Sequence, residues 1–149
     1  MPVTMNHARI SGETFQPWPF KPPATPLNLA TPDADSPLVW WRTRMADDFS
    51  RSDLAPLRGA LKGTQINFEP RWSAAVSGDA AAAIGIAVRQ LKIHPKGARE
   101  IDLALSATVA CAIQRDAASP ILISWALNLR SVIDPRYRAL SDSWLLVDF

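Results

Sequence analysis

The chain has 149 residues, 48% of them hydrophobic, and a formal net charge of +2 at neutral pH. This length suits one domain with a buried core, while so small a net charge excludes strong nucleic-acid binding through bulk electrostatics alone. The single cysteine, Cys111, excludes an intramolecular disulfide. No window reaches about 18 uninterrupted apolar residues, and no signal-peptide pattern opens the chain, so no membrane association and a cytoplasmic location are expected.

Residues 1–36 are predicted to form an extended, proline-rich arm ahead of a helical domain at residues 37–149. Seven of the thirteen prolines lie in this arm, a density that prevents helix formation and disfavours sheet. One interpretation is a disordered tail. The other is that the arm binds the domain or a partner, because Phe15, Trp18 and Phe20 are large apolar side chains that a solvated tail does not require. We predict these three as partner-binding residues.

Residues 38–63 are predicted to form a basic helical hairpin. Four apolar residues recur at the spacing of one helix face: Leu38, Trp41, Met45 and Phe49. Ser36 and Pro37 suit the N-cap and the first helical position, and Gly63 can end the second helix in a left-handed conformation. Trp40 is out of phase with the apolar face, and it is predicted to contact a partner, either by stacking on a base or within an interface. The other interpretation is that Trp40 fills space in the core.

The next segment, residues 64–77, is predicted to be a loop that Ile66, Phe68 and Trp72 hold against the core. Asp79 is then placed to cap a third helix over residues 80–93, and the sequence from His94 to Gly97 turns the chain.

A fourth helix is predicted from about Ala98. Between residues 101 and 113 its only charge is Asp102, which indicates a buried central helix. Ser-Pro and Asp-Pro pairs open a fifth and a sixth helix at residues 119 and 134. Four residues are predicted to lie in the core: Leu105, Val109, Trp125 and Leu129. With no alternating strand pattern in the chain, the sequence predicts an all-α bundle of about six helices.

No arrangement of residues predicts catalysis. The two histidines, His7 and His94, show no spacing that suits metal ligation or nucleophilic chemistry with Cys111. Glycine-rich phosphate loops, HExxH and GxSxG are all missing from the sequence. Cys111 lies in an apolar run and is expected to be a buried structural thiol. We therefore expect a protein without enzymatic activity, cofactor or metal.

The basic residues carry more information. Arg89, Lys92, His94, Lys96 and Arg99 lie within eleven positions that contain no acidic residue. A helix end, a turn and the next helix start can direct cations and backbone N–H groups at phosphate. The other interpretation is a solvated turn whose cations favour the helix C-terminus. A second basic group, in residues 42–62, is diluted by aspartates that can pair with it instead.

Two stretches resemble the small subunit of the type I-E CRISPR Cascade complex. They are SDLAPLRGALKG at residues 52–63 and ISWALNLRSVIDPRYRALSDSWLLVDF at residues 123–149. The resemblance implies a non-catalytic helical subunit of an RNA-guided DNA-binding complex in antiviral defence, which would touch RNA and DNA backbone and neighbouring protein subunits. It places backbone contacts at Arg58 and Lys62. Together with the basic turn, the predicted nucleic-acid contacts are Arg58, Lys62, Arg89, Lys92, Lys96 and Arg99.

Two other functions remain open on the sequence. A structural or adaptor subunit of another large assembly, such as a phage particle or secretion machine, would explain the aromatic residues without nucleic acid. A small helical DNA-binding regulator or antitoxin would need a clear recognition helix, and the sequence shows none.

Overall fold

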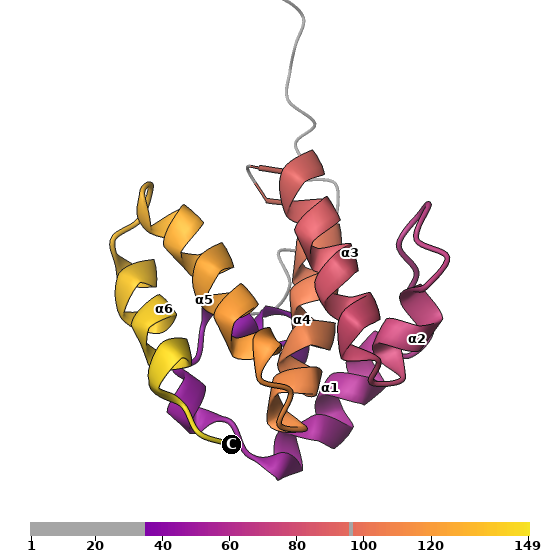
Figure 1. The fold of residues 1–149 in the computed structure, drawn as a ribbon, viewed down its shortest axis with the longest axis horizontal. Helices are drawn as coiled ribbons and strands as arrows, with labels where there is room; N and C mark the ends of the chain where they lie inside the picture. Colours follow the sequence, from indigo (N-terminus) through magenta and orange to yellow (C-terminus); the bar gives the residue numbers. More distant parts are fainter. Residues whose placement is uncertain (1–34, 96) are drawn as a thin grey trace, which may run out of the picture. The chain divides into compact units, whose positions relative to one another are not determined.

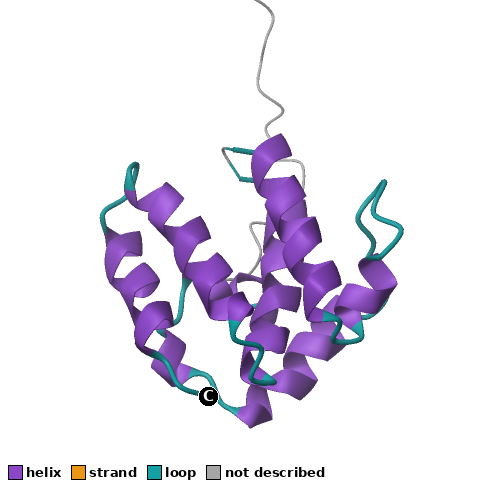
Figure 2. Ribbon diagram, viewed as in Figure 1, coloured by secondary structure: helices purple, strands orange, loops and turns teal. Residues whose placement is uncertain are grey.

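The computed structural model describes residues 35–95 and 97–149 of the chain. All regular structure in these residues is helical, which confirms the predicted all-α fold (Figures 1 and 2). The α-helices are α1 (Leu54–Leu61), α2 (Trp72–Val76), α3 (Ala80–Ile93), α4 (Arg99–Ile113), α5 (Ala118–Ser131) and α6 (Arg136–Leu146). Three short 3-10 helices precede them: η2 (Pro37–Arg42), η3 (Ala46–Asp48) and η4 (Arg51–Asp53). Four residues predicted as contacts lie outside the described residues: Phe15, Trp18, Phe20 and Lys96.

Helix α4 is the centre of the bundle, as predicted. Every residue from 101 to 113 is buried, and α1, α2, α3, α5 and η2 all pack against this helix. Figure 1 shows α4 between α3 and α5. Leu105 and Val109 are fully buried, which confirms these two members of the predicted core. A helix that is apolar on all sides is stable in water only when neighbours cover each side.

The prediction of one continuous helical face from Leu38 to Phe49 is wrong. The cap at Ser36 and the proline at the first position are confirmed, but η2 stops at Arg42 and the chain becomes extended at Met45. The backbone N–H of Ala46 donates to Ser143 Oγ of α6 at 3.0 Å. The segment is therefore bonded to α6 at this point and does not continue as a helix. As a result Met45 is 39% exposed.

The loop between α1 and α2 is only partly attached to the core. Ile66 and Trp72 are buried, as predicted, and the Trp72 indole N–H donates to the Thr64 carbonyl at 2.8 Å. Gly63 ends α1 with a φ of +78°, which also confirms its predicted role. Phe68 was predicted to pin the loop, and this is wrong, because its side chain is completely exposed.

Helix α5 buries a different face from the predicted one. Trp125 and Leu129 are 42% and 48% exposed, so their assignment to the core is wrong. The apolar side chains that α5 buries are Leu122, Ile123, Ala126 and Leu127. The sequence left the phase ambiguous because both faces of α5 are apolar. Contact with α6 decides it: the hydroxyls of Ser124 and Ser141 are 2.9 Å apart in the buried α5–α6 interface.

Helix α6 packs against the core through residues that share one helix face. Trp144 is fully buried against Phe49, with ring centroids 5.3 Å apart. Tyr137, Leu140 and Val147 are partly buried against the same core. None of the described helices is both long and apolar enough to cross a membrane.

Candidate functional site

A buried carboxylate ties the start of the described chain to α4. Asp102 accepts a hydrogen bond from the Trp41 indole N–H at 2.9 Å and two from the Arg42 guanidinium, at 2.9 and 3.2 Å. The hydrogen bond to Asp102 raises the pKa of Arg42. Arg130 of α5 lies over the other side of this network, 4.7 Å from the Trp41 ring. The Arg42 guanidinium is therefore used within the fold.

Arg44 is also used within the domain. Its guanidinium donates to Asp53 at 3.3 Å and to the Asp48 carbonyl at 2.6 Å. It lies 4.6 Å from the Trp40 ring and 4.7 Å from the Phe49 ring. Trp40 is half-buried, and its indole N–H donates to the Asp35 carbonyl at 3.2 Å. Because Arg44 already covers one face of the Trp40 ring, a partner could stack only on the other face.

The structure divides the predicted basic turn. Arg89 makes a two-point ion pair with Glu69, at 2.6 and 3.0 Å, and Gln90 donates to the same carboxylate at 3.2 Å. The hydrogen bond from Arg89 holds the pKa of Glu69 below its usual value. Sequence reasoning missed this pair because Glu69 lies twenty residues before Arg89. Arg89 can reach a phosphate only in competition with Glu69.

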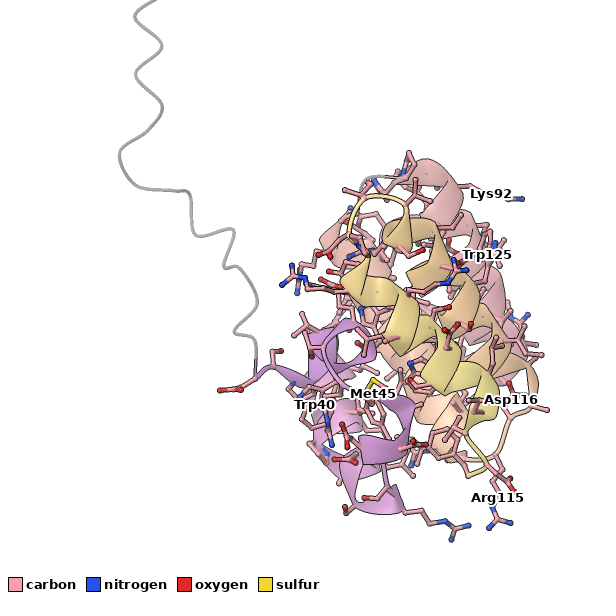
Figure 3. All side chains as sticks on the ribbon, turned by 90° about the vertical axis from the view of Figure 1, so that its left-hand side faces the viewer. Trp40, Met45, Lys92, Arg115, Asp116 and Trp125 are labelled. Carbon is pink, nitrogen blue, oxygen red and sulfur yellow. The ribbon has the colours of Figure 1, made fainter. Side chains whose placement is uncertain are left out.

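Four of the predicted cations remain exposed and have no carboxylate within ion-pair distance among the described residues: Arg58, Lys62, Lys92 and Arg99. Lys92 projects away from the helices in Figure 3. The structure does not gather all four at one point. Arg58 lies in α1 and Lys62 directly follows this helix. Lys92 lies in the last turn of α3, and Arg99 is the first residue of α4.

Positive charge is concentrated on one part of the fold. Residues 54–93, which comprise α1, the following loop, α2 and α3, contain five basic and two acidic side chains, a net charge of +3. The other described residues contain eight basic and ten acidic side chains, a net charge of −2. We call residues 54–93 the basic edge; α2 packs against α3 within it. This asymmetry is invisible in the total charge of the chain.

A hollow of about 690 Å³ lies on the basic edge, between the end of α1, the loop and α2. Both Lys62 and Phe68 line it, together with polar side chains that include Gln65, Asn67 and Ser73. Phe68 has a backbone φ of 65°, a conformation that residues other than glycine and asparagine rarely adopt. Glu69, which is paired with Arg89, lines the hollow as well. The hollow therefore combines an exposed aromatic ring, one unpaired cation and one paired carboxylate.

A second exposed surface runs along α5. Its outer face carries Ile121, Trp125, Leu129 and Val132, which are 62%, 42%, 48% and 86% exposed. Their spacing of four, four and three residues places them on one stripe, which we call the outer α5 stripe. No charged residue lies between residues 117 and 129. Figure 3 shows Trp125 at the surface of the domain.

Nothing in the described residues forms an evident reactive centre. Burial raises the pKa of the Cys111 thiol to about 11, which is consistent with the expected structural role. Among residues 35–95 and 97–149, no group of three or more His, Cys, Asp or Glu side chains is placed to hold a metal ion. No family model matches this chain, and no curated protein or solved structure matches it either.

Proposed function

We propose that the protein is a non-catalytic helical subunit of a larger assembly and that it binds a neighbouring protein through the outer α5 stripe. The observation that carries this proposal is the stripe itself. Helix α5 already buries one apolar face in the domain, and its opposite face is apolar as well. A helix with two apolar faces is normally covered on both sides, and contiguous exposed apolar residues mark interaction surfaces.

The composition of the stripe suits a protein partner. Tryptophan is enriched among the residues that dominate binding energy at interfaces, and charged residues are depleted from interface centres. Trp125 lies in the middle of the stripe, with Ile121 and Leu129 one turn away on either side. Covering a large apolar side chain stabilises a complex by about 1 kcal/mol or more, depending on the area removed from water.

Charge placed on the stripe is expected to prevent assembly without unfolding the domain. The double variant Trp125→Asp, Leu129→Asp should elute as a smaller species than the wild-type protein when native cell extract is separated by size. The matched control is Leu146→Asp, because Leu146 is also exposed, at 84%, but lies at the end of α6. Unchanged helical circular dichroism must accompany the shift. Co-elution of the double variant with the wild-type assembly would refute the proposal.

A second candidate function is contact with nucleic-acid backbone, as expected for a subunit of an RNA-guided complex like the one whose small subunit this chain resembles. The net charge of +3 on the basic edge favours it. Backbone contacts depend on cations that displace counterions from phosphates, and not on base identity. The four exposed and unpaired cations, Arg58, Lys62, Lys92 and Arg99, are the residues that would supply them.

Replacing these four residues by alanine is expected to flatten the salt dependence of binding. Each lost phosphate contact lowers the slope of log K against log salt by about 0.7 to 0.9, so the quadruple variant should lose about three units. The measurement is a salt titration of the full chain with a labelled oligonucleotide. Arg138→Ala is the control, because Arg138 is exposed but lies on α6, whereas the four replaced cations lie on or next to α1, α3 and α4. Figure 3 shows Lys92 and Arg115 at opposite ends of the domain. An unchanged slope in the quadruple variant would exclude this function.

A further inference from the structure

Phe68 occupies a position that the fold does not explain. It is the third residue of a turn closed by a hydrogen bond from the Glu69 N–H to the Ile66 carbonyl at 3.3 Å, and its φ is 65°. Turns with a positive φ at the third residue favour glycine or asparagine there. None of the residues that the structure describes packs against the Phe68 ring in compensation, since the ring is fully exposed. Neither backbone conformation nor burial therefore favours an aromatic residue at this position.

The loop nevertheless holds the backbone of Phe68 in a defined place. On one side of Phe68, Ile66 is 5% exposed, and on the other side the Glu69 carboxylate is fixed by Arg89 and Gln90. The hydrogen bond from Trp72 to Thr64 closes the base of the loop. The loop extends away from the packed helices in Figure 1. A loop whose backbone is fixed before binding loses little backbone conformational entropy when it binds.

The surroundings of the ring indicate what it contacts. Lys62 lines the same hollow as Phe68, and its charge is not compensated by any carboxylate within ion-pair distance among the described residues. The amides of Gln65 and Asn67 line the hollow as well and offer both donors and acceptors. The basic edge as a whole carries a net charge of +3. Sites for single-stranded nucleic acid combine these elements: an exposed aromatic platform for a base and cations that follow the backbone.

We infer that Phe68 stacks on an unpaired base of a single-stranded nucleic acid, with Lys62 beside it on the backbone. This inference rests on the second candidate function proposed above and adds to it a binding residue and a strand state. An apolar pocket on a protein would also accept an exposed phenyl ring. The net positive charge of the basic edge favours a polyanion, because such a pocket would gain nothing from the unpaired Lys62.

The test compares binding of the full chain to labelled oligothymidine and to a labelled duplex, for the wild type and four variants: Phe68→Ala, Phe68→Tyr, Lys62→Ala and Leu146→Ala. Phe68→Ala should weaken binding to oligothymidine by roughly 5- to 150-fold, the loss associated with one base–aromatic stack. It should leave the salt slope unchanged, because no phosphate contact is removed. Phe68→Tyr keeps a stacking ring and should bind like the wild type. Leu146→Ala, an exposed apolar residue of α6, is the control for general loss of apolar surface.

Four outcomes would overturn the inference. In the first, Phe68→Ala binds oligothymidine with wild-type affinity, while Lys62→Ala still lowers the salt slope. This result would support the nucleic-acid function but show that Phe68 does not contribute to it. Equal loss in Phe68→Tyr and Phe68→Ala would show that stacking is not the contribution. Binding of duplex as tightly as oligothymidine would contradict an unpaired base. If no oligonucleotide binds and Phe68→Ala reduces only assembly with proteins, then the nucleic-acid function fails as well and Phe68 is a protein contact.

Discussion

Leu105→Ala is expected to lower the free energy of unfolding by about 2–5 kcal/mol. Leu105 is fully buried in the middle of α4, the helix against which five other elements pack. The truncation removes apolar contact and leaves a cavity that the surrounding helices can close only partly. Chemical denaturation monitored by circular dichroism measures the change.

The matched control for this experiment is Leu146→Ala. The same atoms are removed from a side chain that is 84% exposed, so the free energy of unfolding should change by less than about 0.5 kcal/mol. An equally small change in Leu105→Ala would contradict the assignment of α4 as the centre of the bundle.

Asp102→Ala is expected to lower the free energy of unfolding by about 2–4 kcal/mol. This is the second large effect. The substitution leaves the buried Trp41 indole N–H without its acceptor and the Arg42 guanidinium without its counterion. Removing one partner of a buried ion pair typically costs 3–5 kcal/mol. The Arg42 side chain is 23% exposed, so water can solvate part of it and the expected loss is smaller.

Two further variants separate the terms in this network. Asp102→Asn keeps an oxygen acceptor for Trp41 but removes the charge. Its free energy of unfolding should therefore fall between those of the wild type and the alanine variant. Asp142→Ala removes an exposed carboxylate from α6 and should change stability little. If Asp102→Ala were as stable as Asp142→Ala, the network would not contribute to holding η2 on α4.

The sequence could predict α4 because the residues from 101 to 113 contain a single charge, and only burial on all sides suits such a helix. The same reasoning fails for α5. Leu122 and Trp125 are equally apolar by type, and helical spacing alone does not decide which of them faces the core. That choice depends on α6, through the contact between Ser124 and Ser141, and a single sequence does not state which serines meet.

The basic residues show a similar limit. The sequence identified Arg89 as a cation without acidic residues close to it along the chain. In the folded protein, however, Arg89 forms an ion pair with Glu69. Glu69 follows the turn at Phe68 in the loop before α2, and its carboxylate lies within hydrogen-bond distance of Arg89 on α3. The exposed Phe68 was also missed, since an aromatic residue between Ile66 and Trp72 is expected to join them in the core. Its positive φ and its exposure appear only in the folded chain.

Position-specific crosslinking tests the proposed assembly role most directly. A photoreactive phenylalanine derivative would replace Trp125 at the centre of the outer α5 stripe and, as the control, Leu146 at the exposed end of α6, in the full chain expressed in its native cells. The proposal predicts a discrete covalent adduct with another polypeptide from position 125 and none from position 146. Illumination that yields no adduct at position 125, or the same adducts from both positions, would contradict a protein interface on α5.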